Sequence, residues 1–284
     1  MREEKQKELV RIFDEACYRH NRWNVWSDFV LMAAISISNC VDKSNAESRE
    51  RDYMAMAQKY NKRELECLSN MLAAVITGLE ANPDQDFLGE LYMSLDLGNE
   101  HAGQFFTPYD VCKCMAKITG GADLKARIEH DGWISVNDTA CGAGALLVAF
   151  ANECLEQKVN YQTSVLFVAQ DIDPIVAAMC YIQMSLLGCA GYVVVGNTLT
   201  TPSTCIDRRG LIARPGQNIW YTPFYFHNVW SWRRAWAQMD MLFASGCEEQ
   251  KAIPEVVEEQ KPELEPEPTV IAFNTTKTGQ LTLF

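Results

Sequence analysis

The sequence lacks the features that would assign a protein of this size to a membrane, to secretion or to metal binding. No apolar run reaches the roughly 20 residues of a membrane span, and the first ten residues, MREEKQKELV, lack the apolar stretch of a signal peptide. The eleven cysteines include no CxxC pair, and the four histidines lie far apart in no metal-ligand pattern. We therefore expect a cytoplasmic protein with reduced thiols, without membrane or metal partners.

Charge is distributed unevenly along the chain. The 284 residues carry a net charge of −12, which taken alone argues against binding to nucleic acid. However, residues 248–268 hold eight glutamates and two lysines, and so account for half of that charge. Residues 208–239 hold five arginines and no acid. The overall acidity therefore hides a basic, aromatic-rich segment that could serve DNA.

The order of helical and strand-like segments predicts an α/β fold. Apolar residues recur at helical spacing through much of residues 3–80 and again over 86–96. From residue 133, the strand-like runs WISVNDTA, VLFVAQDID and GYVVVGNTL alternate with apolar helical stretches. This alternation predicts a parallel sheet with helices on its faces. We interpret IWYTPFYF, residues 219–226, as a fourth strand, after which no further strand–helix unit follows.

We divide the chain into a helical N-terminal segment, residues 1–100, an α/β domain, residues 101–246, and a tail, residues 247–284. Four prolines lie among the glutamates of residues 248–268, a composition typical of disorder.

The turn after the first strand could bind a nucleotide. Gly142 and Gly144 let the backbone turn sharply and approach a ligand closely. Leu147 stands where the dinucleotide fingerprint has its third glycine, which disfavours a nicotinamide cofactor. A tight turn with no ligand is equally compatible with this motif alone.

The next two strands also end in polar side chains. Asp171 follows the second strand, where a carboxylate can accept hydrogens from both ribose hydroxyls. Asp173 precedes Pro174 and suits the N-cap of the next helix. Asn197 follows the third strand, where an amide could read the edge of a purine.

Four ordered motifs resemble the N6-adenine DNA methylase family, which includes the modification subunits of type I restriction systems. They are GQFFTP at 103–108, DTACGAG at 138–144, QDID at 170–173 and GNTL at 196–199, with a similar helical lead-in, DFLGELY, at 86–92. The resemblance implies a Rossmann-like, S-adenosylmethionine-dependent methyltransferase core. The missing downstream strand–helix units favour a truncated sheet.

By this resemblance the cofactor is S-adenosylmethionine. The residues implied to bind it are Phe106, Thr107, Pro108, Asp138, Gly142, Gly144, Asp171 and Asn197. The Phe-Thr-Pro group would close over the methionine end, and the glycine turn would lie beneath it. Thr139 and Ala143 depart from the usual proline and serine, and Asn197 replaces the commoner aspartate.

The catalytic motif of the family, [ND]-P-P-[YF], occurs nowhere in the sequence. The candidate in its place is Tyr221, Thr222, Pro223 and Phe224, which keeps one proline and the aromatic residue but loses the compact amine acceptor. Three interpretations follow. Phe224 stacks on a flipped base in a divergent site, methyl transfer is lost from a retained fold, or the segment is a buried strand.

Residues 227–239, HNVWSWRRAWAQM, combine tryptophans with arginines. The candidate DNA-binding residues are Arg208, Arg209, Arg233 and Arg234. Trp230, Trp232 and Trp236 could stack on bases, or they could cap the open edge of the sheet. We favour capping for Trp236 and Trp232, and we expect the arginines to be exposed.

The tail ends in QLTLF, which resembles the peptide by which bacterial proteins dock on the replication sliding clamp. The implied docking residues are Gln280, Leu281, Leu283 and Phe284. The alternative is that this peptide folds back onto its own domain.

The sequence therefore indicates a DNA N6-adenine methyltransferase or a degenerate derivative, in a bacterial or mobile-element setting. Its expected partners are DNA, the clamp and a specificity or partner subunit. The alternative is a non-catalytic adaptor that binds DNA and the clamp.

Overall fold

The computed structural model describes residues 2–95, 106–203, 205–207, 209–249, 274–275 and 281–282. The chain forms two units, Met1–Phe243 and Ala244–Phe284. In the second unit, β5 (Asn274–Thr275) pairs antiparallel with β6 (Leu281–Thr282). The docking residues Gln280, Leu283 and Phe284 lie outside the described residues. Of the predicted disordered segment 248–268, the first two residues end a helix, Asn228–Glu249, and the rest lies outside the described residues.

The first unit begins with a group of helices. They are α1 (Arg2–Ala16), the 3-10 helix η1 (Cys17–Arg19), α2 (Arg22–Val41), α3 (Ala46–Ala57), α4 (Lys62–Ala81) and α5 (Phe87–Ser94). α4 begins with a capping box, in which Asn61 accepts from the backbone of Glu64 while the Glu64 side chain accepts from the backbone of Asn61. The helical N-terminal segment predicted from the sequence is confirmed.

One of these helices has the length and composition of a membrane span. α2 has 20 residues and is long and apolar enough to cross a bilayer by length and composition. However, it packs against α10 (Pro174–Leu186), and 56% of its most apolar window is buried inside the fold. Its one acidic residue, Asp28, is buried and accepts hydrogen bonds from Lys59 at 3.0 Å and Tyr60 at 2.9 Å. A buried core helix can therefore have the same length and apolar composition as a membrane span.

The α/β part follows in the predicted order. Its elements are α6 (Tyr109–Gly120), α7 (Leu124–Asp131), β1 (Ile134–Asp138), α8 (Ala145–Glu156), α9 (Tyr161–Ser164), β2 (Val165–Asp171), α10, β3 (Ala190–Val195), β4 (Asn218–Tyr221), the 3-10 helix η2 (Pro223–Phe226) and α11 (Asn228–Glu249). The three strands predicted from residue 133 onward are confirmed. The fourth is shorter than expected, because residues 223–226 turn into η2.

The sheet has the order β1–β2–β3–β4. β1, β2 and β3 run parallel, as predicted. β4 runs antiparallel to β3, so that Asn218 lies opposite Val195 and Tyr221 lies opposite Tyr192. The α/β fold with a mostly parallel sheet is therefore confirmed. Because β4 runs antiparallel, its carboxyl end lies at the edge of the sheet where the other three strands begin.

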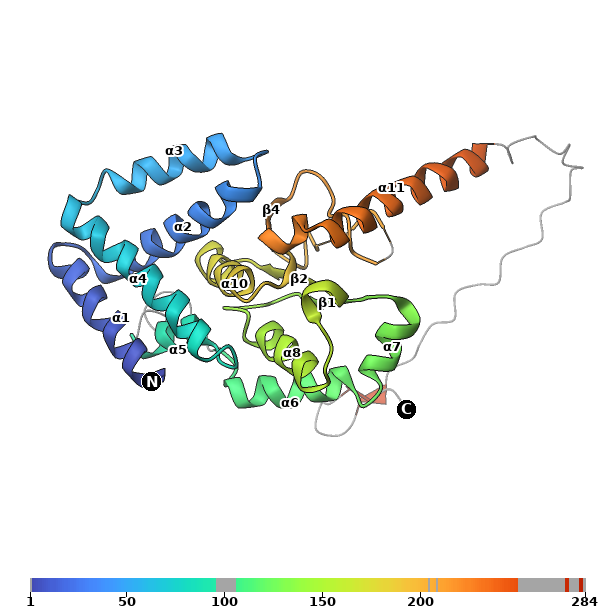
Figure 1. Ribbon diagram of the computed structural model, residues 1–284, viewed down its shortest axis with the longest axis horizontal. Coiled ribbons are helices and arrows are strands. Elements are labelled where there is room, and N and C mark those ends of the chain that lie inside the picture. The colour runs from blue at the N-terminus through green and yellow to red at the C-terminus, as the bar shows by residue number, and fades with distance from the viewer. Residues whose placement is uncertain are drawn as a thin grey trace, which may run out of the picture. The chain divides into compact units, whose positions relative to one another are not determined.

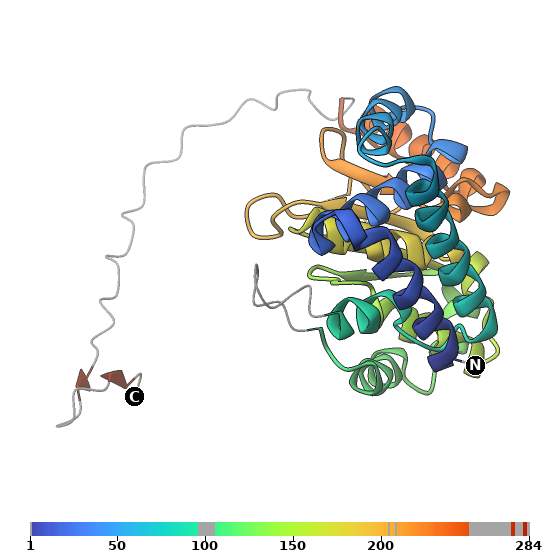
Figure 2. The same ribbon diagram turned by 90° about the vertical axis from the view of Figure 1, so that its left-hand side faces the viewer.

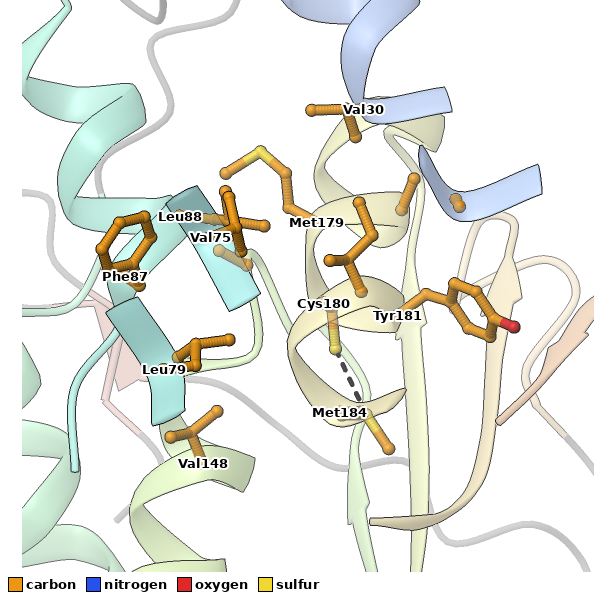
Figure 3. Close-up of a cluster of buried hydrophobic side chains, with 14 of the residues drawn as sticks. Val30, Val75, Leu79, Phe87, Leu88, Val148, Met179, Cys180, Tyr181 and Met184 are labelled. Carbon is orange, nitrogen blue, oxygen red and sulfur yellow. Dashed lines mark hydrogen bonds between the residues drawn. The ribbon is translucent and has the colours of Figure 1, made fainter. Parts of the chain in front are cut away.

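The main core lies between the sheet and the N-terminal helices. Figure 3 shows Met179 of α10 near Val75 of α4 and Leu88 of α5. In Figure 1 the helices α1 to α4 gather on the α10 side, and Figure 2 shows them stacked together in front of the strands. A second core covers the other face of the sheet, where Tyr192 of β3 packs with Leu211, Tyr225 and Trp230. The helices are thus part of the unit that carries the sheet.

A buried ion pair ties these helices to β4. Arg49 of α3 donates to Asp42 at 2.8 Å, to Ser38 at 2.6 Å and to the backbone carbonyl of Ile219 at 2.9 Å. Its guanidinium also lies 4.2 Å from the ring of Trp220. Burial alone would raise the pKa of Asp42, but hydrogen bonds from Ser44 and Arg49 outweigh it and hold the pKa below its usual value.

We expect Arg49→Ala to destabilise the fold by about 3–5 kcal/mol, because it leaves the Asp42 carboxylate buried without its partner. Arg51→Ala is the matched control on the same helix, since Arg51 pairs with Glu47 on the surface and should cost at most about 0.5 kcal/mol. Urea unfolding followed by circular dichroism measures both. Equal midpoints for the two variants would contradict this role of Arg49.

Candidate functional site

The carboxyl ends of the three parallel strands meet at one edge of the sheet. Asp138 ends β1, Asp171 ends β2, and Asn197 follows β3 in the next loop. Backbone hydrogen bonds of 2.9 Å join Cys141 to Gln170 and Gly196 to Asp171. These bonds, with the parallel register, bring together three of the positions that the sequence assigned to a cofactor.

The turn after β1 depends on two glycines with left-handed backbone. Gly142 has a φ of 54° and Gly144 a φ of 95°, a region that side chains disfavour. A Cβ on Gly144 would lie 2.8 Å from Sγ of Cys180, so the close packing of α8 on α10 requires glycine there. A Cβ on Gly142 would lie 3.4 Å from the ring of Phe106, and would narrow the space between the turn and this ring.

That space is part of a cavity of about 220 Å³. It is lined by Asp86, Phe106, Thr107, Cys112, Met115, Asp138, Ala140, Cys141, Gly142, Ala143, Ala145 and Leu146. Four of the predicted cofactor residues thus line one cavity, namely Phe106, Thr107, Asp138 and Gly142. The first half of the GQFFTP motif, residues 103–105, lies outside the described residues.

Asp171 and Asn197 support the loops at this edge. Oδ2 of Asp171 accepts from the backbone of Gly142 at 2.9 Å, and Oδ1 accepts from Asp173 at 3.0 Å. Oδ1 of Asn197 accepts from Leu199 at 2.9 Å. A carboxylate has about four lone-pair sites, so Asp171 retains acceptor capacity. Asp173 caps α10 by accepting from Ile175 at 2.8 Å, as predicted.

The cavity has a negative character. Asp86 and Asp138 line it, and the lining residues that the structure describes include no lysine or arginine. Burial raises the pKa of Asp138, a hydrogen bond from the backbone of Ala140 opposes this, and the charge of Asp171 raises it further. Such an environment favours a ligand with positive charge and opposes a pyrophosphate. Among the residues that the structure describes, no group of His, Cys, Asp and Glu could hold a metal ion.

Two buried glutamines organise this edge, and sequence reasoning gave neither of them a role. Gln183 of α10 donates to Asp86 and to the carbonyl of Ala143, each at 2.8 Å, and accepts from Leu88 at 3.2 Å. Gln170 donates to the carbonyl of Gly196 at 3.1 Å and supports the loop after β3. A lone polar residue inside an apolar helix or strand was the available signal for both.

The segment Tyr221–Phe224 does not lie beside these residues. Because β4 is antiparallel to β3, Tyr221 lies opposite Tyr192 near the start of β3, whereas the cofactor positions follow the strand ends. The expectation that this segment lies at the cofactor edge is therefore wrong. Thr222 is fully buried, and its hydroxyl accepts from the backbone of Gly191 at 3.0 Å and donates to Cys189 at 2.7 Å. These contacts are structural, which favours the buried-strand interpretation.

The tryptophans and arginines of α11 also differ from expectation. Trp230 is the buried one, with its indole donating to Gln162 at 2.7 Å, whereas Trp232 and Trp236 are 77% and 67% exposed. The prediction that the latter two cap the sheet is wrong. Arg233 and Arg234 are half-buried rather than exposed, because each stacks on an aromatic ring and donates to backbone carbonyls.

Arg209 is exposed, as expected, and its guanidinium lies 3.7 Å from the ring of Trp133. Arg208 lies outside the described residues. A role of these four arginines in DNA binding stays a prediction.

The comparisons with known proteins agree with the motifs. The sequence model of the N-6 DNA methylase family matches residues 84–231. Among curated proteins, none matches the sequence significantly.

Two solved structures are remotely similar. One, described as a class I S-adenosylmethionine-dependent methyltransferase from Listeria monocytogenes, is 16% identical with a TM-score of 0.37, over 71% of this chain and 56% of that chain. The other, a type I restriction-modification methyltransferase subunit from Streptococcus thermophilus, is 19% identical with a TM-score of 0.34, over 70% of this chain and 45% of that chain. This chain thus spans about half the length of each.

We expect Asp138→Asn to raise the unfolding temperature at neutral pH. The folded state raises the pKa of Asp138 above its ordinary value of 3.8. At any pH above this raised pKa, the ionised carboxylate therefore lowers the free energy of unfolding. The gain should shrink as the pH falls through the raised pKa. Differential scanning calorimetry from neutral to acidic pH measures it. Asp52→Asn, on the exposed face of α3, is the control, and an equal gain in both variants would contradict the cause given.

Proposed function

This chain belongs to the N-6 DNA methylase family, and we propose that it binds S-adenosylmethionine beside the Gly142 turn without transferring the methyl group to adenine on its own. The observation that carries this proposal is the direction of β4. The residues suited to the cofactor follow the parallel strands, whereas Tyr221–Phe224 follows a strand that runs the other way. DNA is the substrate class that the family implies.

The fit of the cofactor rests on the donor set and shape of the cavity. S-adenosylmethionine carries a sulfonium and an ammonium, which suit a cavity lined by Asp86 and Asp138, with no lysine or arginine among its described lining residues. Asp171 has acceptor capacity for the ribose hydroxyls. Phe106 faces Gly142 across a gap that a side chain at 142 would narrow. When bound, the cofactor supplies an electrophilic methyl group.

The missing part is the group that would receive the target amine. Transfer to an exocyclic amine requires a hydrogen-bond acceptor within about 3 Å of that amine and an aromatic surface for the flipped base. The [ND]-P-P-[YF] motif that provides both in the family is absent from the sequence. Thr222, which stands in the nearest equivalent, uses its hydroxyl to hold the start of β3. We therefore assign the base-handling group to another chain, such as a partner subunit.

We also propose a second role, as an adaptor on the replication clamp, supported by the terminal peptide with Gln280, Leu281, Leu283 and Phe284. Part of this peptide, Leu281–Thr282, is extended, a conformation that suits docking on another protein. The role is compatible with a bacterial cytoplasm, in which the ten described cysteines stay free. It does not depend on methyl transfer.

Isothermal titration calorimetry with the full chain tests the cofactor. We expect micromolar binding of S-adenosylmethionine, weakened at least about tenfold by Asp171→Asn, because the amide is a poorer acceptor of ribose hydroxyls. Asp173→Asn is the matched control two residues away, because the Asp173 side chain caps α10 and does not line the cavity, and it should leave the affinity unchanged. Absence of binding by the wild type would refute the proposal.

Methyl transfer is tested by incubating the chain with labelled S-adenosylmethionine and DNA of varied sequence. We expect no incorporation by the chain alone, and no effect of Phe224→Ala on cofactor affinity, because Phe224 stacks on His227 away from the cavity. Incorporation that is lost in Phe224→Ala would show that this segment does handle the base.

Deletion of residues 280–284 should abolish capture of the chain by an immobilised bacterial sliding clamp. The deletion should leave S-adenosylmethionine affinity intact, because the cavity lies wholly in Met1–Phe243. Unchanged capture by the clamp would refute the adaptor role alone.

A further inference from the structure

The outer part of α11 carries an exposed apolar stripe that the cofactor site does not use. Trp232 is 77% exposed, Trp236 67%, Met239 46% and Phe243 70%. Figure 1 shows α11 running away from the sheet beyond its first turns. Large apolar side chains grouped in this way on a surface are typical of a binding interface.

The spacing of these residues is that of a coiled-coil seam. They follow one another at intervals of four, three and four residues, which places all four on one face of a helix. When a second α11 lies antiparallel, with Trp236 opposite Met239, Trp232 lies opposite Phe243. Each contact then occurs twice, as a two-fold axis requires. The pairing of Met239 with Trp236 is also a favourable sulfur–aromatic contact.

The charges beside the stripe favour the same arrangement. Arg233 is half-buried, and burial together with the nearby charge of Arg209 lowers its pKa. Its guanidinium donates to the backbone carbonyls of Thr163 and Gly132, but among the described residues no carboxylate forms a salt bridge with it. Asp240 lies one heptad further along the same side of α11. In the antiparallel register, Asp240 of a second copy lies within about two residues, roughly 3 Å along the axis, of the level of Arg233.

The available area suits a weak, reversible dimer. A fully buried aromatic side chain buries roughly 150–250 Å². Because Trp232, Trp236 and Phe243 are 67–77% exposed, three from each copy bury on the order of 800 Å² in total, which is the size of a transient interface. We propose that α11 docks antiparallel on α11 of a second copy of this chain through Trp232, Trp236, Met239 and Phe243. DNA or another protein on the stripe are the competing occupants.

Sedimentation velocity of the full chain from about 1 to 100 µM tests this proposal. We expect the wild type to sediment at twice its mass of 32.1 kDa, and Trp236→Glu to be monomeric with an unchanged circular dichroism spectrum. Ile118→Glu is the matched control, because Ile118 is 81% exposed on α6, and this variant should remain dimeric. A monomeric wild type, or a Trp236→Glu variant that stays dimeric, would overturn the proposal.

Asp240→Arg tests the antiparallel register apart from general stickiness. Asp240 is exposed and lies outside the apolar stripe, so the change removes no apolar contact. The new arginine lies beside a positive charge only if Arg233 of the second copy is close. We therefore expect the dissociation constant of the dimer to rise at least about tenfold. Unchanged dissociation overturns this register. A monomer that binds DNA through Trp236, shown by a loss of gel shift in Trp236→Glu, would assign the stripe to nucleic acid instead.

Discussion

Strand direction decides which residues of this fold can act together. The carboxyl ends of β1, β2 and β3 meet at one edge because the three strands are parallel, and Asp138, Asp171 and Asn197 gather there for that reason. β4 is antiparallel to β3 and ends at the other edge. The residues that directly follow β4 therefore lie at the opposite edge of the sheet from the cavity beside Gly142.

Buried polar groups hold together the edge of the sheet that carries the cavity. Gln183 joins the helical lead-in at Asp86 to the turn at Ala143, and Asp171 holds the same turn through Gly142. Such networks are costly when incomplete, because a buried amide or carboxylate without a partner pays its full desolvation penalty. The cavity thus depends on the N-terminal helices as well as on the sheet. The Arg49–Asp42 pair extends this dependence to β4.

The sequence was sufficient for the order of elements. β-rich runs alternating with apolar helical stretches located β1 to β3. The polar residues expected at the strand ends, Asp138, Asp171 and Asn197, do lie at one edge of the sheet, while their binding of a cofactor stays a prediction. The direction of β4 was not accessible, because an apolar run reads the same for a parallel and an antiparallel strand. The roles of Trp230, Trp232 and Trp236 were misassigned for a related reason. The three tryptophans lie on the same helix and look alike in the sequence. Trp230 is the buried one because it packs edge-on against Trp133, a contact between residues that are distant in the sequence.

The central claim is that cofactor binding and base handling are separated in this chain. A crystal structure of the full chain with a non-reactive analogue of S-adenosylmethionine tests it most directly. We expect the analogue between Phe106 and the Gly142 turn, with its ribose at Asp171, and Thr222 still bonded to Gly191 at the far edge of the sheet. A structure in which β4 lies parallel beside β1, with Phe224 facing the methyl position of the analogue, would contradict the account.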